Sequence, residues 1–264
     1  MLLYRIPAVL IALTLHEMAH GYVALRCGDP TAQMMGRLSF NPLRHLDPIG
    51  TVFMLLFGFG WARPVPVNPR NFRRFRRDDF LVSIAGITVN LLLFLATTVV
   101  MVGVNQLIFS PDMWRQGYPL LTPREFLSFD GANFGNIMLG ADYLFVHHVR
   151  DNLYSAVDLS YLSAYIRFPW LLYLQRFFMI FSMINLGLAV FNLLPIPPLD
   201  GYRLVNDALA KGRLNIPYNV VRGLGFAFML LCFFTSIVSN LIGTVIYFVQ
   251  GRLVGALLWI FGVA

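Results

Sequence analysis

The sequence predicts an all-α polytopic membrane protein, and three observations favour this class: its composition, its apolar runs and the placement of its charges. Of 264 residues, 58% are hydrophobic and 12% are charged, whereas an average soluble domain carries about 25% charged residues. Long apolar runs recur along the chain, and basic residues cluster between them. This composition excludes an ordinary soluble enzyme, a disordered chain and a nucleic-acid-binding domain, so the expected surroundings are the lipid bilayer.

Three apolar runs are long enough to be spans, because a transmembrane helix needs about 20 apolar residues. They cover residues 2–25, 80–104 and 177–194, and residues 169–174 lengthen the third. From residue 224 the chain is apolar almost to its end, so we expect further hydrophobic helices within 211–264.

The run 49–62 is shorter and contains Gly58 and Gly60. Apolar runs of about 10–14 residues favour re-entrant or interfacial elements over full crossings. We therefore expect a membrane re-entrant loop here.

Charge placement predicts the orientation of the spans. The Arg-rich stretch 63–77 is expected in the cytoplasm, because cytoplasmic loops carry an excess of Lys and Arg. The span after it then leads outward, which makes 105–168 an extracytoplasmic insertion of loops and short amphipathic pieces. The basic residues of 203–213 follow the returning span and are also expected in the cytoplasm.

A metal-binding pattern, His16-Glu17-Met18-Ala19-His20, lies inside the first apolar run. On a helix, residues four apart share a face, so both imidazoles can reach one ion while Glu17 serves as general base. The alternative is an accidental pattern. An ionisable residue inside a membrane costs about 2.5–3.5 kcal/mol and marks function by default, so three of them in five positions favour a zinc site.

A third protein ligand is needed, because catalytic zinc sites use three ligands plus a water. The candidate is Asp200, which follows the proline-rich end of the run at 177–194. Broken backbone at membrane depth is tolerated where it lines a cavity. The alternative is a capping aspartate in a cytoplasmic turn.

Together these residues resemble the site-2 protease family of intramembrane zinc metalloproteases. One helix of that family carries HExxH, matched by residues 16–20, and a later helix carries NxxPxxxLDG, matched by 192–201. The stretches 36–42, 46–51 and 60–69 are also similar to the small bacterial branch that lacks PDZ and CBS domains. We expect the core to begin with the first span, without the extra span that many members place before it.

The resemblance implies one peptidase domain over 1–264, with a three-helix catalytic core formed by an HExxH helix, a middle helix and an LDG helix. It implies one Zn²⁺ per chain and hydrolysis by Glu-assisted attack of a zinc-bound water. The ligands would be His16, His20 and Asp200, the catalytic residues Glu17 and Asn192, and the substrate-binding residues Asn90, Gly58 and Gly60. In the middle span, Ile87 replaces the family's usual proline, so a kink there is not assured.

The expected substrates are single-pass or membrane-anchored proteins, cut in or near a transmembrane segment by an enzyme of the bacterial cell membrane. Its active site would lie towards the cytoplasmic side. Two other readings stay open: an inactive relative that binds membrane clients, and a transporter or channel with an ion site. The intact set of Glu17 and three ligands argues against the first, and the concentration of polar residues around one broken helix argues against the second.

Overall fold

The computed structural model describes a largely helical chain. The described residues are 2–48, 50, 62–108, 143–148, 153–158, 167–168, 170–208 and 217–260. They fall into two units, one of Met1–Leu95 with Ile180–Ile246 and the other of Ala96–Met179 with Tyr247–Ala264. Three long helices contribute residues to both units, and each unit is described by itself.

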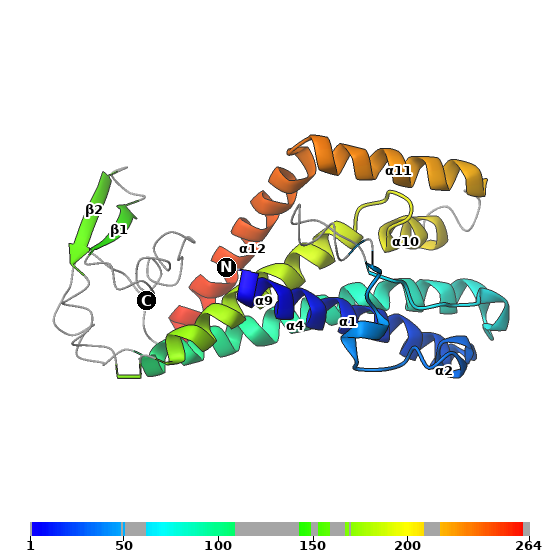
Figure 1. Cartoon of the computed structure of the whole chain (residues 1–264), viewed down its shortest axis with the longest axis horizontal. Helices are drawn as coiled ribbons and strands as arrows, with labels where there is room; N and C mark the ends of the chain where they lie inside the picture. Colours follow the sequence, from blue (N-terminus) through cyan, green and yellow to red (C-terminus); the bar gives the residue numbers. More distant parts are fainter. Residues whose placement is uncertain are drawn as a thin grey trace. The chain divides into compact units, whose positions relative to one another are not determined.

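The elements follow one another along the colour gradient of Figure 1. The α-helices are α1 (Leu2–Cys27), α2 (Thr31–Met34), α4 (Phe75–Ile108), α9 (Leu171–Asn192), α10 (Asp200–Ala208), α11 (Tyr218–Phe234) and α12 (Ile237–Ile260). Two short 3-10 helices are η1 (Pro42–Arg44) and η2 (Pro69–Asn71).

Four helices of the described chain are long and apolar enough to cross a membrane: Leu3–Cys27, Phe75–Val104, Leu171–Asn192 and Ile237–Leu257. A shorter apolar helix covers Asn219–Cys232. The first three match the predicted spans, and α11 and α12 provide the expected C-terminal hydrophobic helices. The helical polytopic class is therefore confirmed.

A β-hairpin lies within the predicted insertion, where loops and short amphipathic pieces were expected. Strand β1 (Tyr143–His148) pairs antiparallel with β2 (Leu153–Asp158), with Tyr143 opposite Asp158. Both strands are rich in the aromatic and β-branched residues that favour pleated backbone. The assignment of 105–168 to the outer side of a membrane stays a prediction.

Helix α1 ends at Gly28, whose backbone adopts a left-handed conformation that favours glycine. Gly28 has φ of +109°, its N–H donates to Leu25 O, and the Asp29 N–H donates to Ala24 O. This pair of bonds is the Schellman arrangement that satisfies the last carbonyls of a helix. The chain then turns into α2, and the end of α1 is well defined.

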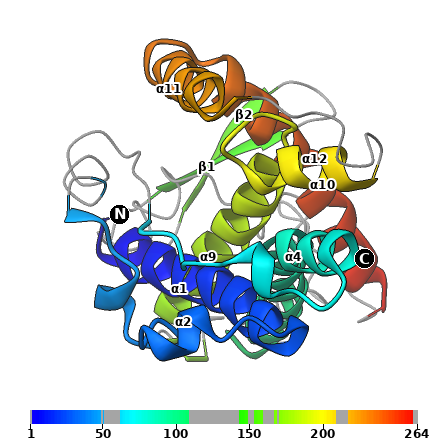
Figure 2. The ribbon, with the colours of Figure 1, turned by 90° about the vertical axis from the view of Figure 1, so that its right-hand side faces the viewer.

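The first unit holds α1 against the early part of α4 (Figure 2). Ala24 and Cys27 of α1 are buried with Val82 of α4 and with Phe72, which precedes it. Further along α4, a second cluster of three buried residues joins it to α9 and α10. Its members are Ile87, Ala189 and Leu204.

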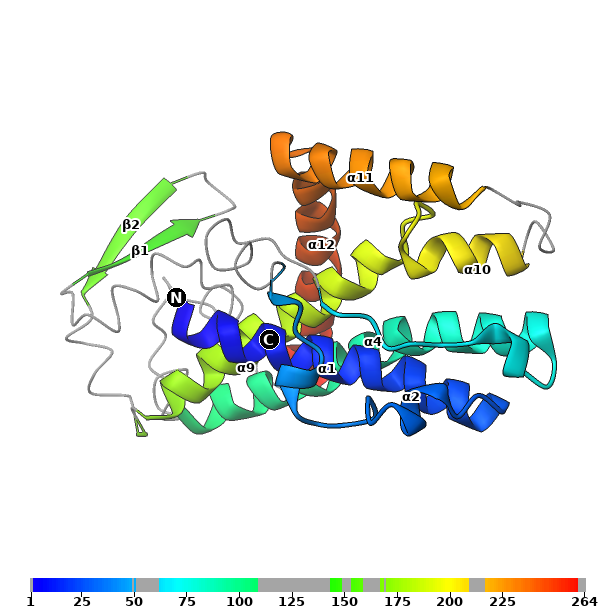
Figure 3. The same ribbon diagram turned by 45° about the vertical axis from the view of Figure 1, so that its right-hand side comes forward.

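Helix α9 stops at Asn192, and seven residues without helical structure separate it from α10. In Figure 3, α11 lies across this connection. The rings of Phe191 and Phe228 are 5.7 Å apart between centroids, and Gly225 brings the α11 backbone against Pro198, where an added Cβ would be 3.1 Å from Cδ. The broken segment is therefore covered by a helix.

The second unit has its own small core. Met101 and Val102 of α4 are buried together with Met179 of α9 and Val254 of α12. Phe178 and Leu257 pack against this cluster. Helix pairing in this unit therefore depends on apolar side chains, two methionines and two valines at its centre.

The run predicted to be re-entrant falls mostly on residues 49 and 51–61, which lie outside the described residues. Its flanks are described, and they meet. Leu46 and Ala62 form an isolated antiparallel bridge, and the Arg63 N–H donates to His45 O at 2.8 Å. The chain thus re-enters the described structure beside the place where it leaves.

Candidate metal centre

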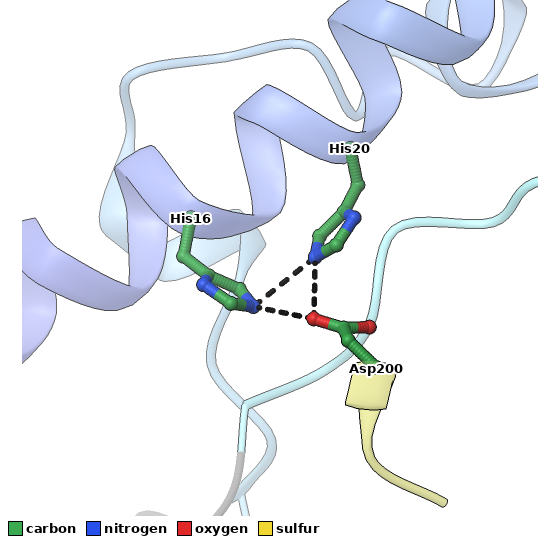
Figure 4. A group of neighbouring side chains, drawn as sticks. All are labelled: His16, His20 and Asp200. Carbon is green, nitrogen blue, oxygen red and sulfur yellow. Dashed lines mark hydrogen bonds and ion pairs between the residues drawn. The ribbon is translucent and has the colours of Figure 1, made fainter. Parts of the chain in front are cut away.

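Two histidines of one helix and one aspartate of another converge on a single point (Figure 4). Asp200 Oδ2 lies 3.4 Å from His16 Nε2 and 3.1 Å from His20 Nε2. The two Nε2 atoms are 3.1 Å apart. One ligand atom from each residue lies within 4.8 Å of the others, so the three side chains are close enough to share an ion.

The first helix presents both imidazoles on one face because they are four residues apart. The His16 and His20 side chains are 6% and 11% exposed, which places them in the interior of the first unit. Aspartate 200 comes from the first turn of α10, and its side chain is 19% exposed. The predicted meeting of the HExxH helix with the LDG segment is therefore present in the structure.

Helix α4 supports the two histidines through three positions spaced four residues apart: Val82, Gly86 and Asn90. His20 Nδ1 donates to Val82 O at 2.7 Å, and the Asn90 amide lies 3.1 Å from His16 Nδ1. Because His20 meets the earlier residue of α4 and His16 the later one, the two helices run antiparallel here.

Gly86 makes room for the imidazoles. A Cβ at this position would collide with His20 Nε2 and lie 2.7 Å from His16 Nδ1. Any larger residue would therefore push the rings out of place. Sequence reasoning assigned no role to Gly86, although its place in a motif similar to the family's middle span was the available signal.

Asn90 is fully buried, and its side chain contacts a histidine. Among the described residues its Oδ1 atom has no hydrogen-bond partner, while its Nδ2 faces His16 Nδ1. Since amide oxygen and nitrogen are assigned from the network, turning the amide over lets Oδ1 accept a hydrogen bond from His16 Nδ1–H. Both imidazoles would then keep their Nε2 lone pairs for the shared point.

A metal fits this arrangement of acceptors. A carbonyl can only accept, so Val82 O holds the proton of neutral His20 on Nδ1 and leaves the Nε2 lone pair facing Asp200. Asp200 Oδ2 is buried and has no hydrogen-bond donor within the described residues. Two imidazole nitrogens and one carboxylate oxygen are a common ligand set for zinc, and carbonyl or amide partners on the far ring nitrogens are typical of metal-bound histidines.

Asp200 reaches the histidines because the chain folds back sharply before α10. A Cβ on Gly201 would collide with the carbonyl oxygens of Leu193 and Leu194, so only glycine allows this approach. This is the physical reason for glycine directly after the aspartate.

Asn192 is the last residue of α9, and its Nδ2 donates to Leu188 O at 3.0 Å. This bond runs within its own helix and leaves the second hydrogen of the amide available. Its expected role toward a bound carbonyl stays a prediction.

Glu17 is tied to the stretch that follows the predicted re-entrant run. Its Oε2 accepts a hydrogen bond from the Val65 N–H at 2.7 Å. Nearby, buried Arg37 donates to Arg63 O at 2.8 Å and to Pro64 O at 3.3 Å. Three bonds thus hold 63–65 against the loop after α1 and the glutamate beside the histidines.

A substrate peptide that paired as a β-strand with the stretch 63–66 would find few free backbone N–H donors. The N–H groups of Arg63 and Val65 are taken by His45 O and Glu17, and Pro64 and Pro66 have none. Gly58 and Gly60 lie outside the described residues, so their role in substrate binding stays a prediction.

Comparison with known proteins points to one family. A sequence model of the family described as "Peptidase family M50" matches residues 4–235. The candidate zinc metalloprotease YwhC of Bacillus subtilis (strain 168) is 35% identical over 236 residues, which are 89% of this chain and 82% of YwhC.

A second relative matches a shorter part of the chain. The candidate zinc metalloprotease Rip2 of Mycobacterium tuberculosis is 33% identical over 108 residues, or 39% of each chain. The Rip2 protein of Mycolicibacterium smegmatis is 28% identical over 107 residues, again 39% of each chain. No solved structure matches the chain.

Proposed function

Because the chain belongs to peptidase family M50, we propose that it is an intramembrane zinc endopeptidase whose metal is held by His16, His20 and Asp200. The observation that supports this proposal most directly is the convergence of these three side chains on one point. The relatives' names describe candidate zinc metalloproteases, which agrees with the ligand set. The apolar helices place the enzyme in a membrane as an integral protein.

Zinc, when bound, lowers the pKa of a coordinated water and polarises a peptide carbonyl. The chain's own residues position the two imidazoles and take up the proton of the attacking water. Val82 O and the Asn90 amide orient the two imidazoles, and Gly86 leaves the space that they occupy.

Glu17 is the proposed general base. It lies beside His16 in the sequence and is half-buried, and the Val65 N–H fixes one of its carboxylate oxygens. A single hydrogen bond to one oxygen leaves the other able to accept a proton from water and to deliver it to the leaving amine. The Asn192 amide, with its second hydrogen, is the proposed donor to the developing oxyanion.

The proposed substrates are single-pass or membrane-anchored proteins, cut in or near the membrane. A transmembrane helix hides its carbonyls in intrahelical bonds, so the substrate must unwind before cleavage. The site lies where α9 breaks before α10, and irregular backbone at membrane depth is compatible with a cavity lined by protein. We place this site towards the cytoplasm because the basic residues of 63–77 and 203 lie on the same side of their spans.

The decisive experiment replaces Glu17 by Gln. The variant keeps the shape and a hydrogen-bond acceptor for Val65 N–H, but it cannot take a proton from water. We expect wild-type zinc content by metal analysis of purified protein and no cleavage of a reconstituted single-pass substrate. Cleavage at the wild-type rate would exclude Glu17 as the base, and absence of zinc from the wild type would exclude the metal site.

A further inference from the structure

A surface cavity of about 420 Å³ lies where α1 ends and α4 begins, apart from the candidate metal centre. Four arginines line it: Arg26 from α1, Arg73 and Arg74 from the turn before α4, and Arg77 from the first turns of α4. Its volume falls within the range of about 300–1,000 Å³ that small-molecule sites usually have.

The charge of this cavity is strongly positive. Asp78 is the one carboxylate among its lining residues, and it is buried with its Oδ2 already accepting a hydrogen bond from the Arg74 N–H at 2.7 Å. Arg26 donates to the neutral hydroxyl of Tyr22, with its guanidinium 5.2 Å from the ring centroid. Four guanidinium groups around one carboxylate leave an excess of positive charge that suits an anion.

The turn that carries Arg73 and Arg74 is fixed to the end of α1. The Arg73 N–H donates to Cys27 O at 3.1 Å, which joins the turn before α4 to the end of α1. Gly28 has positive φ, and an added Cβ there would lie 3.3 Å from Arg73 Cγ. Phe72 is buried beside this turn, in the cluster that joins α1 and α4. The arginines therefore project from a fixed turn.

The cavity also has apolar walls and lies at the ends of two candidate spans. Val23 and Leu81 line it together with the arginines, and both lie within the first two turns from the ends of the spans Leu3–Cys27 and Phe75–Val104. A ligand that matches both parts carries a negative head and an apolar tail.

We propose that this cavity binds the phosphate headgroup of an anionic phospholipid, with the upper part of its acyl chains against Val23 and Leu81. Arginine forks bind phosphate oxygens in pairs, and basic pockets at the cytoplasmic ends of membrane helices bind anionic headgroups. Free phosphate carries the same charge but has no apolar part, so the walls favour the lipid. Such a lipid would hold together the helices that carry and support His16 and His20.

The test compares two double variants that remove the same charge from one short stretch. Arg73→Gln/Arg77→Gln removes two cavity arginines. Arg70→Gln/Arg76→Gln removes two exposed arginines that do not line the cavity. Full-length protein in neutral detergent is mixed with phosphatidylglycerol or with phosphatidylcholine of the same acyl chains, and native mass spectrometry counts the retained lipids.

We expect the wild type and the Arg70/Arg76 control to retain phosphatidylglycerol in preference to phosphatidylcholine. The Arg73/Arg77 variant should retain about tenfold less of the anionic lipid. Thermal unfolding in detergent checks that each variant folds. If the double variant does not fold, Arg26→Gln, an exposed position on α1, is tested in its place. It should also retain less phosphatidylglycerol than the wild type, with a smaller decrease because one arginine is removed.

Three outcomes would overturn the proposal. An equal loss of retained phosphatidylglycerol in the two double variants would mean that the basic surface attracts anionic lipid without a specific site. Equal retention of the two lipids would remove the preference for negative charge. Displacement of phosphatidylglycerol by an equal concentration of inorganic phosphate would assign the cavity to the free anion, because the acyl chains would then add nothing to binding. None of these results depends on peptidase activity.

Discussion

Around the two histidines of α1, the Asn90 amide is the side-chain partner of His16, and the other supports come from groups without side-chain chemistry. Val82 contributes a carbonyl oxygen, Gly86 contributes the absence of a side chain, and Val65 contributes an N–H to Glu17. A metal ligand whose far ring nitrogen is bonded this way keeps one tautomer. The geometry of the site is thus set as much by the neighbouring backbone as by the ligands.

We expect Gly86→Ala to lower zinc affinity by at least tenfold, because the new methyl group would occupy the space of both imidazoles. Metal content after dialysis against a weak chelator measures the effect. Gly103→Ala, on the same helix with nothing within 4 Å of its added Cβ, is the matched control. Alanine favours helix over glycine by about 1 kcal/mol, so a loss confined to Gly86 could not come from helix propensity. Unchanged zinc in Gly86→Ala would contradict the packing described.

Asp200 and Asn192 should separate metal binding from catalysis. Asp200→Ala removes a ligand and should reduce zinc content, whereas Asn192→Ala should keep zinc and lower turnover by about 10²–10³ through loss of an oxyanion donor. Metal analysis and cleavage assays on the same preparations distinguish the two. Equal zinc in Asp200→Ala and wild type would count against its role as a ligand.

These residues also show what the sequence could predict about the site. His16, Glu17 and His20 were candidates from their types and spacing, because ionisable residues in apolar runs are costly. Asp200 was the candidate for the missing third ligand because it follows a proline-rich break and matches the family's LDG motif. Val82 and Val65 could not be found in this way, since every residue carries a backbone carbonyl and every residue except proline carries a backbone N–H. Asn90 was expected to contact substrate, and the structure places it against His16; a contact with substrate stays a prediction.

Among the elements, the loop after α1 joins distant segments through one buried carboxylate. Asp29 accepts hydrogen bonds from the Asn68 N–H, the Asn71 side chain and Thr31. Burial alone would raise the pKa of Asp29, but these bonds outweigh it and lower the pKa below its ordinary value. The carboxylate therefore links α2 to the stretch 68–71 that leads into α4.

Because its pKa is lowered in the folded state, Asp29 stabilises the fold at pH values above about 4, the pKa of an aspartate in the unfolded chain. This contribution is lost as the pH falls through the pKa of Asp29 in the folded state. Asp29→Asn should lose about 1–3 kcal/mol of stability at neutral pH, because one donor of the group then lacks an acceptor. The difference between wild type and variant should shrink in acid. Thermal unfolding in detergent between neutral pH and pH 3 measures it, and a difference independent of pH would contradict the assignment.

The long helices were predictable because hydropathy over about 20 residues is a strong signal. The hairpin β1–β2 was missed because each strand has six residues, too few to stand out beside apolar runs of about 20 residues. The substitution of Ile87 for proline has a visible outcome, since α4 continues without interruption to Ile108 and Ile87 packs against α9 and α10.

For the molecule as a whole, the paired flanks of the predicted re-entrant run bear on topology. Leu46 and Ala62 are bridged, which supports placing 26–44 and 63–77 on one side of the membrane. We expect cysteines introduced at Ser39 and at Ser128, with Cys27 and Cys232 replaced, to react from opposite sides in labelling of intact cells. Reaction of both from outside would mean that the run 49–62 crosses the bilayer.

The order of the ligands along the chain has a consequence for biosynthesis. Asp200 is translated 180 residues after His20, an interval of about 10–40 s at ribosomal rates of roughly 5–20 residues per second. During that time a nascent chain with α1 and α4 inserted offers two imidazoles and no carboxylate partner from α10. If Asp200 is the third zinc ligand, as proposed, the peptidase site is complete only after α10 has been synthesised, and the nascent chain carries no complete site before then.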